Sequence, residues 1–292
     1  MPEDNSSKIG FFRILRKNWM AWYALWFLVL YIAVIVVSIY VLNFNPYDQQ
    51  TLDFFRKPRI SISFTNGISP FILGTDDLGR DFFARLIYAC RNTFSCAFIA
   101  AVISFTIGGL IGFAAAFFPC RILHILRILV ASTSSYTPLI LAFAFITVLG
   151  PSLKNATAAI AVSLIPRFAA IAYEIFSDEL KKDYITAVKL DGASLWQLFR
   201  LSLLPNIREL MVVQFTKHFS MAILDISALG FLGLCVVDPE PELGNMISEN
   251  MDLLYTGNYW IIIFPGFAII SFVIAINVLS DGIRTVLHRE NS

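Results

Sequence analysis

Long uncharged stretches dominate the chain and predict its fold class. Four of them are long enough for a helix to cross a bilayer, at residues 19–42, 93–119, 128–150 and 255–280, because a hydrocarbon core about 30 Å thick needs roughly 20 apolar residues. Two more, 156–176 and 210–235, are interrupted by charges. The pattern predicts an all-α membrane protein with six transmembrane helices.

The segment between the fourth and fifth spans has a different pattern, which predicts a pair of short helices. Ser177 or Asp178 is expected to cap the first helix, and Gly192 to end it in a left-handed conformation. Ser194 and Gln197 have the spacing of a capping box that opens a second helix. Pro205 is expected to stop that helix.

This helix pair carries more apolar side chains than a solvated loop needs. Leu195, Leu198 and Phe199 are expected on one face of the second helix, with Trp196 beside them. Exposed apolar groups of this size indicate a partner surface. An interfacial pair lying on lipid is the alternative.

A row of small residues along the second span predicts close helix packing. It recurs every fourth position, at Cys96, Ala100, Ser104, Gly108, Gly112 and Ala116. Small side chains let a neighbouring backbone approach closely. A pivot at the Gly108–Gly109 pair is the alternative.

Two charges within the fifth span are candidates for a transport pathway. Lys217 and Asp225 are eight residues apart, on roughly the same helix face. Charges at membrane depth usually face a protein interior or a water-filled path. Pathway lining and structural pairing both remain open for this pair.

The distribution of Lys and Arg predicts the orientation. Placing the N-terminus in the cytoplasm also puts the basic residues of 181–208 and the C-terminus there, while residues 236–258 contain five acids and no Lys or Arg. That acidic stretch is expected on the outer side, as a docking surface or a solvated loop. Residues 43–92 carry six basic residues outside, but long outer segments follow the rule weakly.

Composition excludes several classes of protein. With 57% hydrophobic residues and a mean hydropathy of +0.70, the chain is too apolar for a soluble domain, and its net charge of +1 forms no basic face for nucleic acid. The cysteines and histidines are not spaced for a metal site or a disulfide framework. No phosphate loop and no hydrolase motif occur, so we expect no enzyme and no bound cofactor, with ATP used by partner subunits.

Residues 186–205 carry a first resemblance to a known family. Thr186-Ala187-Val188, then Gly192 and Pro205, resemble the EAA loop of ABC-importer permeases, although Thr186 stands where the family has glutamate. In that family the loop forms coupling helices that dock into a groove of the cytoplasmic ATPase. The resemblance assigns ATPase coupling to Ala187, Gly192, Ala193, Leu195, Trp196, Leu198, Phe199 and Pro205.

A second resemblance lies before the second span. Residues 73–94, LGTDDLGRDFFARLIYACRNTF, resemble a periplasmic motif of the dipeptide, oligopeptide and nickel permeases. Its matching residues are Gly74, Thr75, Asp76, Gly79, Arg80, Asp81 and Arg85. From the residues alone, we expect Thr75 or Asp76 to cap a helix, Asp81 to pair with Arg85, and the apolar side to rest on the outer membrane face.

Later residues support the same family. FLGL at 231–234, DPEPELGNM at 238–246 and FPGFAII at 264–270 follow in the family's order. The resemblance implies a MetI-like ABC permease core in residues 93–284 with cytoplasmic coupling helices in the loop 178–206. Residues 1–92 then hold the N-terminal span and a periplasmic segment with an amphipathic helix, and residues 285–292 are a cytoplasmic tail.

The resemblance also implies a function and partners. Nearest are the Sap-type permeases, linked to uptake of peptides, including antimicrobial ones, and to putrescine export. The expected partners are a second homologous permease, two cytoplasmic ABC ATPases, a periplasmic substrate-binding protein and the lipid of the bacterial inner membrane. A secondary transporter driven by an ion gradient is the alternative, although no inverted repeat is evident.

Overall fold

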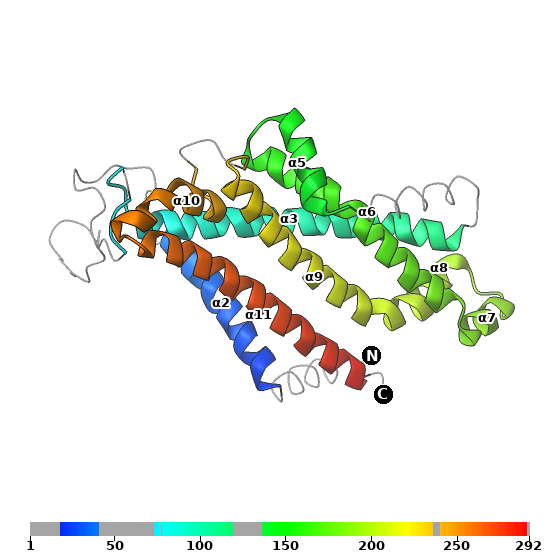
Figure 1. Ribbon diagram of the computed structural model, residues 1–292. Helices are drawn as coiled ribbons and strands as arrows, with labels where there is room; N and C mark the ends of the chain where they lie inside the picture. Colours follow the sequence, from blue (N-terminus) through cyan, green and yellow to red (C-terminus); the bar gives the residue numbers. More distant parts are fainter. Residues whose placement is uncertain (1–17, 41–72, 77, 119–135, 236–239, 291–292) are drawn as a thin grey trace.

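The computed structural model describes residues 18–40, 73–76, 78–118, 136–235 and 240–290 (Figure 1). Within these ranges every regular element is a helix, and one isolated bridge joins Thr75 to Asp81. The all-α prediction is therefore confirmed for the part of the chain that the structure describes. The helices are α2 (Trp19–Tyr40), α3 (Phe82–Phe117), α5 (Pro138–Leu149), α6 (Leu153–Leu180), α7 (Asp183–Leu190), α8 (Leu195–Gln197), η1 (Leu198–Leu203), α9 (Leu204–Phe231), α10 (Leu243–Glu249), η2 (Met251–Thr256) and α11 (Trp260–Glu290).

Four of the described helices, α2, α3, α6 and α11, are long and apolar enough to cross a membrane. Helix α5 has 12 residues, and residues 128–135 of the predicted third span lie outside the described part of the chain. Helix α9 has 28 residues but carries four charges. The six-span arrangement stays a prediction.

The long helix α3 runs through the molecule and packs along α6, while α2 and α11 lie side by side (Figure 1). The row of small residues on α3 is buried at this contact, from Cys96 to Gly112. A Cβ atom on Gly112 would lie 2.6 Å from the Cβ of Ala172 and 2.8 Å from the carbonyl oxygen of Ala169. The predicted close packing is confirmed, because these two backbones approach only where α3 has no side chain.

Replacing Gly112 with leucine is expected to separate α3 from α6. The new side chain would meet backbone atoms of α6, which are not free to move aside, so we expect a loss of roughly 3 kcal/mol or more of stability, as in severe overpacking. Thermal denaturation of the purified protein measures this loss. Gly109→Ala is the matched control, because a Cβ there would meet only Phe168 Cε1, at 3.7 Å. Equal destabilisation by both variants would contradict the packing assigned to Gly112.

Candidate functional site

The segment between α6 and α9 begins later than expected. Helix α6 continues through Ser177 and Asp178 to Leu180, and α7 starts at Asp183. The predicted cap at Ser177 or Asp178 is therefore wrong. Phe176 is buried, and Leu180 packs against the core of this segment, so the apolar face of α6 extends past the residues that resembled a helix start.

The corner between α7 and α8 is formed as predicted. Gly192 has a φ of +79°, and the Ala193 N–H donates to the carbonyl of Val188 at 3.4 Å, which closes the end of α7. The Ser194 N–H donates to Gln197 Oε1 at 2.9 Å, and the Gln197 N–H donates back to Ser194 Oγ at 3.3 Å. The capping box is confirmed.

Pro205 does not stop the second helix, which corrects the prediction. Helix α8 continues through the π-helical η1 into α9, and the Leu204 N–H donates to the carbonyl of Phe199, five residues earlier. Pro205 is the second residue of α9 and lies directly after the π-helical turn. The second of the two predicted short helices is therefore continuous with the predicted fifth span. A π-helical turn at such a place often marks a functional site.

We name residues 178–206 the coupling segment; its inner face is apolar and packed. Ile185, Leu198 and Leu203 are buried together. Leu198, which was predicted to face a partner, is only 1% exposed and holds the segment against the protein instead. Ile185 and Leu203 were missed by sequence reasoning. Their cluster combines residues of α7 and η1 with Phe117 of α3 and Leu180 of α6, which the spacing along one helix does not reveal.

The outer face of the coupling segment exposes large apolar side chains. Leu190, Trp196 and Leu201 are 82%, 66% and 71% exposed. Sequence reasoning identified Trp196 and missed Leu190 and Leu201. Of the other predicted coupling residues, Ala187, Gly192 and Pro205 are exposed, Ala193 and Phe199 are partly buried, and the side chain of Leu195 lies outside the described part of the structure.

A polar network ties the coupling segment to both long helices. The Tyr184 hydroxyl on α7 donates to Glu179 Oε1 of α6 at 2.5 Å, and Asn206 Nδ2 of α9 donates to the Tyr184 oxygen at 2.9 Å. Lys182 Nζ lies 2.9 Å from Glu179 Oε2. Burial and the adjacent Glu179 carboxylate raise the pKa of Tyr184 to about 12, so the hydroxyl keeps its proton at neutral pH. We call Glu179, Tyr184 and Asn206 the latch.

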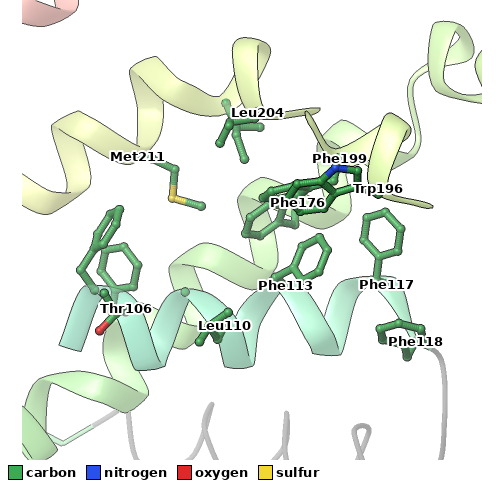
Figure 2. Close-up of a pocket in the computed structure, with 14 residues that line it drawn as sticks. Thr106, Leu110, Phe113, Phe117, Phe118, Phe176, Trp196, Phe199, Leu204 and Met211 are labelled. Carbon is green, nitrogen blue, oxygen red and sulfur yellow. The ribbon is translucent and has the colours of Figure 1, made fainter. Parts of the chain in front are cut away.

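An apolar cavity of about 610 Å³ lies beside the coupling segment (Figure 2). Trp196 and Phe199 border it on one side, and α3 borders it on the other with Phe113 and Phe117. The Trp196 and Phe199 rings stack with centroids 6.0 Å apart. Its full lining is Phe105, Thr106, Gly109, Leu110, Phe113, Phe117, Phe118, Phe168, Phe176, Trp196, Phe199, Leu204, Ile207 and Met211.

The motif at residues 73–94 is centred on Asp76, whose role differs from the prediction. Asp76 Oδ2 accepts from Arg80 Nε and from Arg85 NH1, both at 2.7 Å, and all three side chains are buried. Its Oδ1 accepts the backbone N–H of Leu78 and of Arg80. Asp76 therefore does not cap a helix. Asp81 does so, accepting the Phe83 N–H at 2.9 Å at the start of α3.

Arg85 joins this motif to a distant element. Its guanidinium contacts Asp76 and also lies 3.6 Å from Glu249 at the end of α10, so the predicted Asp81–Arg85 pair is wrong. Gly74 and Gly79 shape the preceding turn with positive φ, and Thr75 is buried. Burial raises the pKa of Asp81 to about 6.

The apolar side of this motif packs on protein rather than on the membrane face, which corrects a further prediction. Phe82 is fully buried and packs in one cluster with Leu243 and Met246 of α10 and Ile261 of α11. Helix α3 runs without a break past residue 92, where the domain boundary was predicted. The motif thus consists of the turn before α3 and the first turns of α3.

Glu242 shows that the acidic stretch is not simply a solvated loop. Its carboxylate is fully buried, accepts the Thr93 hydroxyl at 2.9 Å and caps α10 through the Asn245 N–H. Burial raises its pKa. Glu242 therefore joins α10 to α3, while Glu240 is exposed.

Lys217 and Asp225 have different surroundings. Lys217 is exposed on α9, whereas Asp225 is partly buried and its Oδ2 has no hydrogen-bond partner among the described residues. Their pathway role stays a prediction.

Comparison with known proteins identifies the family. The profile of the family described as "Binding-protein-dependent transport system inner membrane component" matches residues 68–291. The di/tripeptide transport system permease protein DppC of Pseudomonas aeruginosa is 39% identical, covering 83% of this chain and 80% of the relative. The peptide transport system permease protein SapC of Haemophilus influenzae is 31% identical, covering 99% and 97%.

A solved structure supports the fold. A chain of the inward-facing MetNI methionine ABC transporter superposes with a TM-score of 0.57 at 19% identity, covering 69% of this chain and 95% of that one. At this identity the likeness concerns the fold alone. The chain thus belongs to the binding-protein-dependent transport system inner membrane components. It is a permease subunit and not an enzyme.

Proposed function

We propose that the chain is a permease subunit that moves peptides across the bacterial inner membrane, powered by separate ABC ATPases. The relatives named as peptide and dipeptide permeases support the substrate class. Antimicrobial peptides and putrescine are narrower candidates within the proposal. The coupling segment, with its exposed Leu190, Trp196 and Leu201, carries the ATPase part of the proposal.

The proposed assembly contains a second homologous permease, two ATPases and a periplasmic binding protein. Both termini lie in the cytoplasm in this arrangement, and six spans cross the membrane. The exposed face of the coupling segment contacts the ATPase, and the latch passes its movement to α6 and α9. Movement of two helices about a shared contact is a hinge or shear change between two states.

Co-purification and uptake test this function. We expect tagged permease to retain ATPase subunits and membrane vesicles to take up labelled di- and tripeptides when ATP is supplied. Labelled putrescine and a longer cationic peptide, tested in parallel, define the narrower substrate. Collapsing the ion gradients with ionophores should leave peptide uptake intact. Uptake that follows the gradient, with no ATPase retained, would favour the secondary transporter instead.

Leu201→Asp tests the outer face of the coupling segment. Leu201 is exposed and does not line the cavity, so the variant should fold. A carboxylate buried without a partner at an interface costs a few kcal/mol, and each 1.4 kcal/mol is tenfold in affinity. We therefore expect at least roughly tenfold less ATPase retained in pull-downs. The matched control is Leu78→Asp, at an exposed leucine within the motif of residues 73–94. Full retention by Leu201→Asp would place the ATPase contact elsewhere.

A further inference from the structure

Three polar side chains lie together where α6 contacts α9. Arg167 is halfway along α6, and His218 is halfway along α9. The His218 ring packs edge-on against Phe168, the residue after Arg167, with ring centroids 4.9 Å apart. Arg167 also interacts electrostatically with both His218 and Asp225. These contacts place one cation and two polar groups of α9 at a single helix–helix contact.

The two polar groups on α9 present buried acceptors that are unfilled. His218 is 2% exposed, and its Nδ1 lies 2.9 Å from the carbonyl oxygen of Gln214. A carbonyl oxygen only accepts, so Nδ1 carries the proton and Nε2 of the neutral ring is an acceptor. Neither His218 Nε2 nor Asp225 Oδ2 has a hydrogen-bond partner among the described residues. Buried acceptors without donors are costly, so a donor should reach each of them in some state of the protein.

Arg167 is a donor that the two acceptors can share, but only in turn. Its guanidinium carries five N–H groups and stays charged. Here it donates to neither His218 Nε2 nor Asp225 Oδ2. Seven residues separate these two acceptors, which is about 10 Å along a helix, more than one planar guanidinium spans. A cation near two open acceptors at membrane depth therefore has two alternative positions.

Helix α6 has a point of bending directly beside this cation. Pro166 lies inside α6 and precedes Arg167. Proline removes one N–H from the helix ladder, and helices bend at such residues. Beyond Pro166, α6 runs on to Glu179 of the latch, which joins it to the coupling segment. Movement of the coupling segment can therefore tilt the second half of α6 and carry Arg167 along α9.

We propose that Arg167 alternates between two partners on α9, forming an ion pair with Asp225 in one state of the transport cycle and donating to His218 Nε2 in the other. The proposal deepens the proposed function and rests on it, because ATPase-driven movement of the coupling segment supplies the change of state. Each partner stabilises one position of α6 against α9. The helix contact thus has two discrete arrangements rather than a continuous range.

Charge exchange in the purified permease alone tests the pairing of Arg167 with Asp225. Arg167→Asp places two carboxylates together and Asp225→Arg places two guanidinium groups together, so each should lower the midpoint of thermal unfolding by roughly 5 °C or more. The double exchange restores a pair and should recover at least half of the loss. Glu174→Gln, at an exposed acid on the same helix, should unfold like the parent.

Cysteine trapping in the assembled transporter tests the alternation. With the four native cysteines replaced by alanine, Arg167→Cys is combined with either Asp225→Cys or His218→Cys, and a mild oxidant joins facing thiols. Between nucleotide-free transporter and transporter trapped with ATP and vanadate, we expect one disulfide to rise and the other to fall, each by roughly fivefold or more. Arg167→Cys with Thr216→Cys is the control and should not be trapped, because the Thr216 hydroxyl donates to Ser280 of α11 at 2.6 Å.

The two measurements separate this proposal from the proposed function. Equal trapping of both pairs in the two nucleotide states, while ATP is being hydrolysed, would show a static polar contact and overturn the alternation. A double exchange without recovery would overturn the pairing. A parent that retains no ATPase would contradict the proposed function and the driving step that it supplies, whereas the unfolding midpoints of the permease alone still decide whether Arg167 and Asp225 pair.

Discussion

Asp76→Ala is expected to destabilise the folded permease by about 3–5 kcal/mol, the cost of breaking a buried ion pair from one side. The side chains of Arg80 and Arg85 are 8% and 3% exposed, and each donates to the same Asp76 oxygen at 2.7 Å. Without that oxygen, the remaining carboxylate contact of Arg85 among the described residues is the longer one, 3.6 Å to Glu249. The variant also removes the acceptor of two backbone N–H groups in the turn before α3.

The loss should appear as a lower midpoint of thermal or denaturant unfolding in detergent. Because these ion pairs are buried, added salt should change the stability difference between the parent and Asp76→Ala only slightly. A surface ion pair would be screened by the same salt. Asp252→Ala in η2 is the control, since Asp252 is exposed and its loss should cost under about 0.5 kcal/mol. A similar small effect of Asp76→Ala would show that this motif serves a surface role, such as binding-protein docking, rather than holding α3 in place.

What the sequence predicts well in this protein is local. The Ser194–Gln197 capping box, the left-handed Gly192 and the small residues of α3 from Cys96 to Gly112 all depend on spacing along one helix or turn. Each is specified by residues at most four positions apart or repeating at that interval. These predictions are confirmed because packing elsewhere does not change the local requirement.

What the sequence did not predict depends on distant partners. Arg85 lies four residues from Asp81, yet its guanidinium contacts Asp76 and Glu249. The bridge from Thr75 to Asp81 folds Asp76 back onto the start of α3, and Glu249 comes from the end of α10. Pro205 is a stop signal in isolation, but the π-helical turn before it lets one helix run on. The buried face of the coupling segment likewise depends on α3 and α6. Local rules fail where tertiary contacts supply a better partner.

The exposed face of the coupling segment follows the same division. Trp196 was recognisable because a large aromatic residue in a charged segment stands out, whereas Leu198 was expected outside and is buried. Each short helix of the coupling segment has one face packed on the protein and one face turned away from it. Both faces carry apolar residues. Sequence periodicity gives the two faces but not which of them is covered.

Tyr184→Phe is expected to separate ATP hydrolysis from transport. The change removes only a hydroxyl oxygen, but it leaves the buried Glu179 without its 2.5 Å donor and Asn206 without its acceptor on α7. A hydrogen bond to a charged group contributes about 1.5–3 kcal/mol. The equilibrium between the formed and the broken latch should therefore shift roughly 10–100-fold toward the broken state. The outer face, with Leu190 and Leu201, is untouched.

We therefore expect ATPase subunits to co-purify normally and to hydrolyse ATP, while peptide uptake falls by roughly tenfold or more. Asn206→Ala, which breaks the other arm of the latch, should act in the same direction without adding fully, because both residues share one network. Tyr255→Phe is the control, since Tyr255 is 93% exposed. Loss of ATPase retention in Tyr184→Phe would mean that the hydroxyl shapes the docking face. Normal uptake would mean that force reaches α6 and α9 through the buried apolar contacts of Ile185 and Leu203 instead.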